Sequence, residues 1–214
     1  MSRSAHASCT VFGVCGIVGY VGERDGIDVV LSGLRRLEYR GYDSAGVAMP
    51  HAGHVEWRKK AGKIANLEAA IGERPLPSGT VAIGHTRWAT HGAPTDQNSH
   101  PHVADRVAIV HNGIIENHGA LREELPGVEF SSETDSEVAA HLLRRELDGG
   151  ADLLAAMRTV VGRLEGAFTL VAVDALDPER IEAARRNSPL VVGVGEGEYF
   201  LASDVAAFIA YTRD

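Results

Sequence analysis

The chain has 214 residues and a formal net charge of −8, with 29 acidic and 21 basic side chains. This length allows one large or two small domains with a buried core, and the interspersed charge argues against a nucleic-acid-binding surface. No stretch is apolar for long enough to span a bilayer, and neither a signal peptide nor an internal repeat is visible. The two cysteines, Cys9 and Cys15, argue against a disulfide framework and favour a reducing, cytosolic compartment.

In the first half of the chain, hydrophobic periodicity predicts one helix and several short strands. The run Cys15–Tyr20 is apolar and contains glycines, which is typical of a buried strand. Apolar residues recur at helical spacing over Asp25–Leu37. Two strands, Val47–Met49 and His54–Arg58, are expected on either side of a turn at His51–Gly53. Two more, Thr80–Gly84 and Arg106–Val110, are expected after a loop at Arg74–Gly79.

The second half opens with helical patterns and ends with strands. An apolar stripe predicts a helix over Ile114–Leu125, and Thr134 and Glu137 have the spacing of a capping box. The helix after this box would turn Val138, Leu142 and Leu143 inward. Another helix is expected at Leu153–Leu164. Four short strands follow, at Ala167–Val173, Arg180–Ala184, Pro189–Val194 and Glu198–Ala202. A last helix is expected at Val205–Tyr211.

This order of elements lacks the alternation of strands and helices that parallel sheets require. Strands come in groups, and helices come in groups between them. The pattern therefore predicts an α+β protein in which antiparallel sheet is layered with helices.

Four polar motifs follow Cys15 in chain order, and together they define a resemblance. They are Arg40–Gly46 (RGYDSAG), Gly84–Gly92 (GHTRWATHG), His111–Gly113 (HNG) and Ser132–Asp135 (SETD). From Cys15 to its end, the chain resembles the glutaminase domain of the glutamine–fructose-6-phosphate aminotransferase family, a branch of the class II, N-terminal-nucleophile amidotransferases. The phosphoribosyl-amine branch of the same class is the nearest alternative.

The resemblance implies a fold, a reaction and a division of the chain. The fold is the four-layer αββα sandwich of N-terminal-nucleophile (Ntn) hydrolases, formed by residues 15–214. The reaction is hydrolysis of L-glutamine to glutamate and ammonia through a γ-glutamyl thioester, without a cofactor. In the family the ammonia passes to sugar-isomerase domains that convert fructose 6-phosphate to glucosamine 6-phosphate, and the full-length enzyme is expected to be a homodimer. No such domains are present, and we expect an excised or truncated glutaminase domain.

Cys15 is the expected nucleophile. A thiol attacks a carbonyl as the thiolate, and a free cysteine has a pKa near ~8.5, so it needs a base. No His or Lys adjoins Cys15 in the sequence. In the family it resembles, the cysteine is the first residue, and its own α-amine, with a pKa of ~7.7–8.0, is the base.

Cys15 is preceded by fourteen residues, and its nitrogen is an amide while Val14 is attached. Residues 1–14 are either a propeptide or the product of a start codon assigned too early, with Val14 at the true initiator. We favour the second explanation. In a third, the extension blocks the nucleophile and the domain is a catalytically silent glutamine-binding module.

The resemblance also assigns the groups that act on the reacting amide. The side-chain amide of Asn112 and the backbone N–H of Gly113 would form the oxyanion hole. Trp88 resembles a gating tryptophan between the two sites of the full-length enzyme. Arg40 lies in a loop that packs beside the nucleophile in relatives, and we expect it to help position the site.

The remaining residues would bind the α-carboxylate and α-ammonium of glutamine. Arg87 suits the carboxylate because its guanidinium is a planar, bidentate donor. Thr90 and His91 would add hydrogen bonds from the same loop. Asp135 would pair with the ammonium group, although an acid there could equally complement a helix dipole.

Two further patterns resemble ligand sites. His100-x-His102, with His91 nearby, lacks the acidic or cysteine ligands of a recognisable metal site, so we expect no metal and solvated histidines. Gly193-x-Gly195-x-Gly197 lies between two predicted strands and not before a helix. It therefore predicts a hairpin turn and not a phosphate-binding loop.

Overall fold

A computed structural model of the protein describes residues 15–89 and 92–214. Within these ranges the strands form two antiparallel sheets. The first has six strands in the order β3-β2-β4-β1-β10-β9: β1 (Gly16–Val21), β2 (Ser44–His51), β3 (His54–Ala61), β4 (Val81–Arg87), β9 (Val191–Val194) and β10 (Tyr199–Ala202). The second has four in the order β5-β6-β7-β8: β5 (His102–Ala104), β6 (Val107–Gly113), β7 (Phe168–Asp174) and β8 (Asp177–Arg186).

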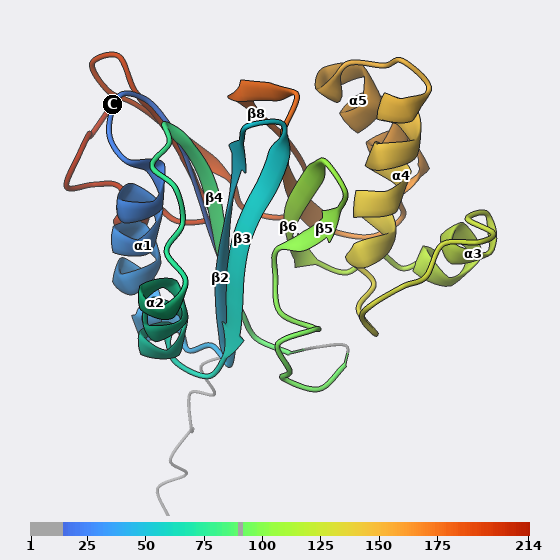
Figure 1. Ribbon diagram of the computed structural model, residues 1–214, viewed down its shortest axis with the longest axis horizontal. Helices are drawn as coiled ribbons and strands as arrows, with labels where there is room; N and C mark the ends of the chain where they lie inside the picture. The colour runs from blue at the N-terminus through green and yellow to red at the C-terminus, as the bar shows by residue number, and fades with distance from the viewer. Residues whose placement is uncertain (1–14, 90–91) are drawn as a thin grey trace, which may run out of the picture.

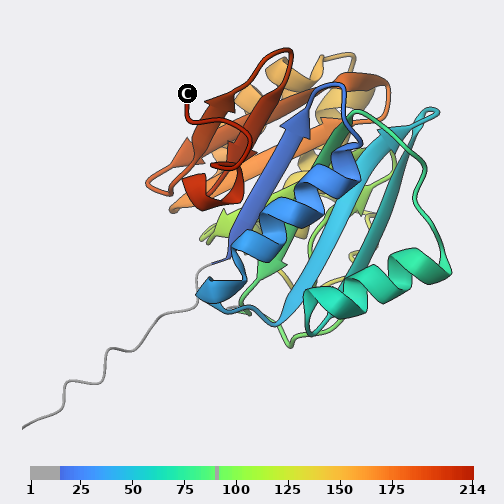
Figure 2. The ribbon, with the colours of Figure 1, turned by 90° about the vertical axis from the view of Figure 1, so that its left-hand side faces the viewer.

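Helices cover the outer face of each sheet, which gives four layers (Figure 1). α1 (Gly26–Arg36) and α2 (Ile64–Glu73) pack on the six-stranded sheet, and Figure 2 shows them in front of it. α4 (Glu137–Asp148) and α5 (Leu153–Arg163) pack on the four-stranded sheet. The α+β sandwich of αββα layers expected from the resemblance is therefore confirmed.

Apolar side chains fill all three gaps between these layers. Ile17, Ile83, Val110 and Val171 belong to a buried cluster between the two sheets. Larger clusters lie between each sheet and its helices. Because most strands are covered on both faces, β4 and β7 are buried along their whole length.

Several local predictions are confirmed. The helix expected at Asp25–Leu37 is α1, and Asp25 caps it by accepting hydrogen bonds from the backbone N–H groups of Ile27 and Asp28. The glycine-rich segment after Val194 is the turn of an antiparallel hairpin between β9 and β10, as predicted. None of the helices formed by the described residues is long and apolar enough to cross a membrane.

The helix predicted over Ile114–Leu125 is wrong for its first four residues. Only α3 (His118–Glu123) is helical. The chain leaves β6 in an extended path because the N–H of Ile114 donates to the carbonyl of Ala167, and that of Ile115 donates to the carboxylate of Asp135. Ile114 is exposed and does not face the core.

The predicted capping box at the start of α4 is also wrong. The hydroxyl of Thr134 pairs with His102, and the Glu137 carboxylate accepts hydrogen bonds from the backbone N–H groups of Ser131 and Ser132. The helix follows nevertheless, and its apolar residues Val138, Leu142 and Leu143 are buried as expected.

The C-terminal end of the chain and two other elements differ from prediction as well. The last helix is only a 3-10 turn, η2 (Val205–Ala207), followed by further turns. α2 and β5 were not predicted. The extension at residues 1–14, with Cys9, lies outside the described residues.

Candidate active site

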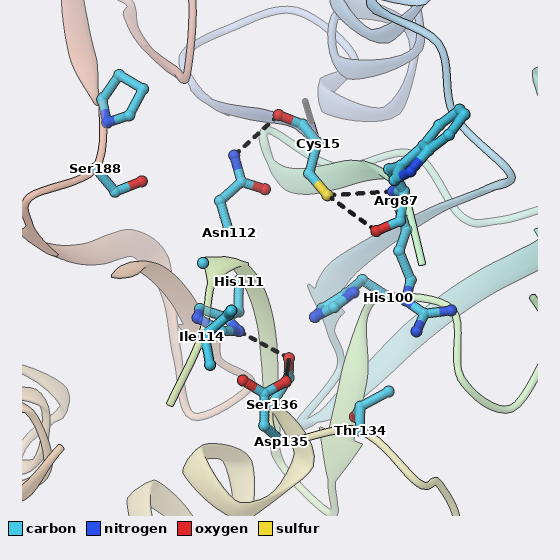
Figure 3. Close-up of a pocket in the computed structure, with 13 residues that line it drawn as sticks. Cys15, Arg87, His100, His111, Asn112, Ile114, Thr134, Asp135, Ser136 and Ser188 are labelled. Carbon is cyan, nitrogen blue, oxygen red and sulfur yellow. Dashed lines mark hydrogen bonds between the residues drawn. The ribbon is translucent and has the colours of Figure 1, made fainter. Parts of the chain in front are cut away.

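Three strand ends from the two sheets meet around Cys15. Cys15 directly precedes β1, while Arg87 ends β4 and Gly113 ends β6. β1 and β4 are antiparallel neighbours, so the start of one lies beside the end of the other. A cavity of about 300 Å³ opens here, with these lining residues: Cys15, Arg87, Trp88, His100, His111, Asn112, Gly113, Ile114, Thr134, Asp135, Ser136, Ser188 and Pro189 (Figure 3).

The Cys15 thiol lies at the edge of this cavity and is held by the backbone of Trp88. The Trp88 N–H donates to Sγ at 3.1 Å, and Sγ lies 3.7 Å from the Trp88 carbonyl oxygen. Burial raises the pKa of the Cys15 thiol, although the Trp88 N–H and the charge of Arg87 partly oppose the rise. The thiol therefore stays protonated at neutral pH unless a base removes its proton.

Asn112 directs a hydrogen-bond donor toward Cys15, and Gly113 lies next to it at the end of β6. The Asn112 amide nitrogen donates to the carbonyl oxygen of Cys15 at 3.0 Å. Gly113 is paired with Phe168 in the β6–β7 ladder. The N–H of the next residue, Ile114, donates to the carbonyl oxygen of Ala167 beside β7. Antiparallel alternation then directs the Gly113 N–H away from β7. Both residues belong to β6 itself, which continues three residues beyond the strand predicted at Arg106–Val110.

Arg87 is the last residue of β4, whereas the sequence placed it in the loop beyond a shorter strand. It is buried, and its guanidinium donates to the carbonyl oxygens of Gly92 and Ala93 at 3.3 and 3.4 Å. These contacts aim the cation at the cavity from the end of the strand. Thr90 and His91, which were expected beside it, lie outside the described residues.

Asp135 lies on the far side of the cavity from Cys15 in Figure 3. Its carboxylate is buried and accepts the Ile115 N–H at 2.7 Å and the Ser136 hydroxyl at 3.4 Å. These two bonds leave further acceptor capacity on the carboxylate for a ligand. With Arg87, it gives the cavity one cationic and one anionic group.

Trp88 and Arg40 occupy different places. Trp88 lines the cavity, and its side chain is 45% exposed. Arg40, in the 3-10 turn η1 (Glu38–Arg40), does not line the cavity. Its guanidinium lies 3.4 Å from the Ser203 hydroxyl, which in turn accepts the N–H of Ile17 in β1. This geometry fits a supporting role through β1 and not direct contact with a substrate.

Four buried histidines were missed as a group by the sequence analysis: His85, His100, His102 and His111. The prediction that His100 and His102 are solvated is wrong. Burial lowers the pKa of all four, that of His85 to about 3, so the rings are neutral at physiological pH. Among residues 15–89 and 92–214, no group of three or more potential ligands is arranged to hold a metal ion.

Other cavity residues gave no signal in the sequence. Ser188 and Pro189 come from the segment between β8 and β9 and line the cavity, and Ser188 is labelled in Figure 3. Ser136 lies on the Asp135 side and hydrogen-bonds His111 at 2.8 Å. The position of Ser136 directly after Asp135 in the SETDS segment is the sequence feature that could have marked it as a cavity residue.

A cysteine before β1 of an αββα sandwich, beside a cavity with charged and polar side chains in its lining, places the protein in the class of Ntn-hydrolase folds. Comparison with protein families then identifies the branch. The model of the glutamine amidotransferase domain matches residues 85–210, more than half of the chain. The chain therefore belongs to the glutamine amidotransferase domain family.

Curated relatives share high identity with this chain. Glutamine–fructose-6-phosphate aminotransferase [isomerizing] from Streptomyces coelicolor is 65% identical over 205 residues, covering 94% of this chain and 33% of the relative. The enzyme of the same name from Corynebacterium glutamicum is 58% identical over 212 residues, with coverages of 94% and 34%. The chain thus spans about a third of the length of the curated relatives it matches.

A solved structure supports the fold. Glutamine phosphoribosylpyrophosphate (PRPP) amidotransferase from B. subtilis, complexed with ADP and GMP, superposes with a TM-score of 0.78 at 27% identity. The match covers 92% of this chain and 44% of that one.

Proposed function

We propose that the chain is a glutaminase domain that hydrolyses L-glutamine to glutamate and ammonia through a thioester on Cys15. The observation that carries this proposal is the set of groups around one cavity. A thiol, an amide donor, a guanidinium and a carboxylate all face it, from Cys15, Asn112, Arg87 and Asp135. Glutamine offers a matching reactive amide, α-carboxylate and α-ammonium.

The reaction would proceed in two balanced halves. The α-amine of Cys15 takes the thiol proton, and Sγ attacks the side-chain carbonyl carbon of glutamine. Asn112 and the Gly113 N–H stabilise the oxyanion, and the C–N bond breaks as the ammonium proton passes to the leaving nitrogen. Water then attacks the thioester with the same amine as base, which releases glutamate and restores the thiol.

This mechanism requires a free amine on Cys15, so we propose that residues 1–14 are absent from the active protein. Residues 15–214 would then form the catalytic domain. While Val14 remains attached, the Cys15 nitrogen is an amide and has no lone pair basic enough to take the proton.

The destination of the ammonia follows from the relatives. The identity of 65% to an isomerizing fructose-6-phosphate aminotransferase favours delivery to fructose 6-phosphate over the phosphoribosyl branch, where the identity is 27%. We propose that sugar-isomerase domains use this ammonia to make glucosamine 6-phosphate, in a homodimeric, cytosolic enzyme.

The test compares two forms of the protein, one beginning at Cys15 and one retaining residues 1–14, with both N-termini verified by intact mass. Glutamate release from glutamine is expected only from the form with the free cysteine. Activity in the form that keeps Met1 would overturn the role of the amine. Glutamine binding without turnover in both forms would establish the silent binding module instead.

Arg87→Lys should weaken glutamine binding more than it slows chemistry. Lysine keeps the charge but loses the planar pair of donors that a carboxylate accepts, so KM should rise by roughly 10-fold or more. Steady-state kinetics of glutamate release will separate KM from kcat. An unchanged KM would show that Arg87 does not bind the α-carboxylate.

A further inference from the structure

His85 contacts Asn112 without lining the cavity itself. It lies in the middle of the six-stranded sheet, between β1 and β2, and is completely buried. Its Nε2 atom is 2.9 Å from Oδ1 of Asn112, which belongs to the opposite sheet. The contact therefore bridges the two sheets at the residue expected to stabilise the oxyanion.

The direction of this hydrogen bond follows from the chemistry of its partners. A carbonyl oxygen only accepts, so Nε2 of His85 must carry the proton and donate it to Oδ1. Burial lowers the pKa of His85 to about 3, so the ring is neutral and carries a single proton. Hydrogen bonds to Asn112 and to the backbone of His111 raise this pKa, but burial outweighs both.

The Asn112 amide is thereby held in one of two possible orientations. With Oδ1 facing His85, the NH2 group faces Cys15 and donates one hydrogen to its carbonyl oxygen (Figure 3). The second hydrogen remains for the substrate oxygen. A flipped amide would place Oδ1 against the Cys15 carbonyl and turn an acceptor toward the developing oxyanion.

We propose that His85 is a positioning residue. Its Nε2–H donates to Oδ1 of Asn112 and thereby keeps the NH2 group of the same amide directed at the oxyanion. The inference rests on the proposed function, because it assigns His85 a part in glutamine hydrolysis. The imidazole acts from the centre of a sheet buried on both faces, which provides the rigid support that a pre-organised donor needs.

The test compares His85→Gln with His85→Met. Glutamine keeps an N–H donor near the position of Nε2, and methionine fills the space without one. Methionine should lower kcat for glutamate release by roughly 10- to 100-fold with little change in KM, whereas glutamine should recover most of that loss. His102→Met is the matched control, because His102 is buried in the same cluster but contacts Thr134, and its kcat should stay near the wild-type value.

Two readouts distinguish positioning from general structural damage. Alkylation of Cys15 by iodoacetamide forms no oxyanion, so its rate in His85→Met should match the wild type. In an Asn112→Ala background, which itself should lower kcat by about 10²–10³, His85→Met should add little further loss. If methionine prevents folding, His85→Asn replaces it, since its amide is too short to reach Asn112.

The proposal is overturned if the folded His85→Met variant (or His85→Asn in its place) keeps the wild-type kcat. It is also overturned if the fold-losses in kcat of this variant and of Asn112→Ala multiply in full in the double variant. Alkylation of Cys15 that slows in parallel with turnover would overturn it as well. A wild-type protein with a free Cys15 that releases no glutamate would instead refute the proposed function. Glutamate release by the wild-type protein therefore distinguishes failure of the His85 proposal from failure of the proposed function.

Discussion

Cys15→Ala should abolish glutamate release from glutamine. The substitution removes the only atom in the cavity that we expect to form the thioester, and no second cysteine is found among residues 15–89 and 92–214. Water attacking the amide directly would lack both the nucleophile and its covalent intermediate, so the remaining rate should be close to that of the buffer. A coupled assay for glutamate measures the loss.

Glutamine binding is the control for this variant. Arg87 and Asp135 come from β4 and from the segment before α4, so the substitution leaves both charged groups in place. The Cys15→Ala protein should therefore still be stabilised against heat by glutamine, by an amount that grows with the logarithm of the glutamine concentration relative to Kd. Normal turnover in this variant would disprove the thioester mechanism.

The elements that could be predicted from the sequence are those with a strong local signal. α1 has a capping aspartate and a wide apolar face, and β1 before it is an apolar run that contains glycines. α2 begins at Ile64 without a side-chain cap and buries only Ile64 and Leu67. β5 has three residues, which is too short for any period to be visible.

The errors at Thr134 and Glu137 have a tertiary cause. Their spacing satisfies the rule for a capping box. In the folded chain, however, His102 lies close enough to pair with Thr134, and the backbone of Ser131 and Ser132 provides donors for Glu137. A local pattern cannot show which of these competing partners wins.

The candidate site likewise contains residues that could be predicted from local motifs and a contact that depends on tertiary packing. Cys15, Arg87, Asn112, Gly113 and Asp135 were selected from motifs, and all five line the cavity. The contact between His85 and Asn112 could not be predicted, because it depends on how the two sheets are packed. β4 is buried on both faces, so no alternation of polar and apolar residues marks the histidine as unusual.

The buried histidines should make the protein unusually sensitive to mild acid. His85, His100, His102 and His111 are each at most 4% exposed, and burial lowers the pKa of every one. In the unfolded chain a histidine takes up a proton near its ordinary pKa of about 6.5. Below that pH the unfolded state binds more protons than the native state, so the free energy of unfolding must fall.

The size of the effect follows from the number of histidines involved. Each histidine that stays neutral in the native state contributes a slope of up to about 1.4 kcal/mol per pH unit below 6.5. His85, with its pKa lowered to about 3, and His100 and His102, whose pKa values lie well below 6.5, together give roughly 4 kcal/mol per pH unit. His111 adds to this slope as far as its lowered pKa keeps it neutral. The sum is a large share of the roughly 5–15 kcal/mol that typically holds a domain folded. Stability should therefore be fully present above about pH 6.5 and largely lost near pH 5, before most carboxylates are protonated.

Denaturant unfolding at several pH values between 7.5 and 5.5 measures this slope. His102→Met should reduce it by about one proton, because His102 is buried and its pKa is lowered. A free energy of unfolding that stays constant over this range would mean that the four rings take up protons in the native state. Such uptake requires that water or counter-charges reach the space between the sheets, which would also weaken the case that His85 remains a fixed, neutral donor to Asn112.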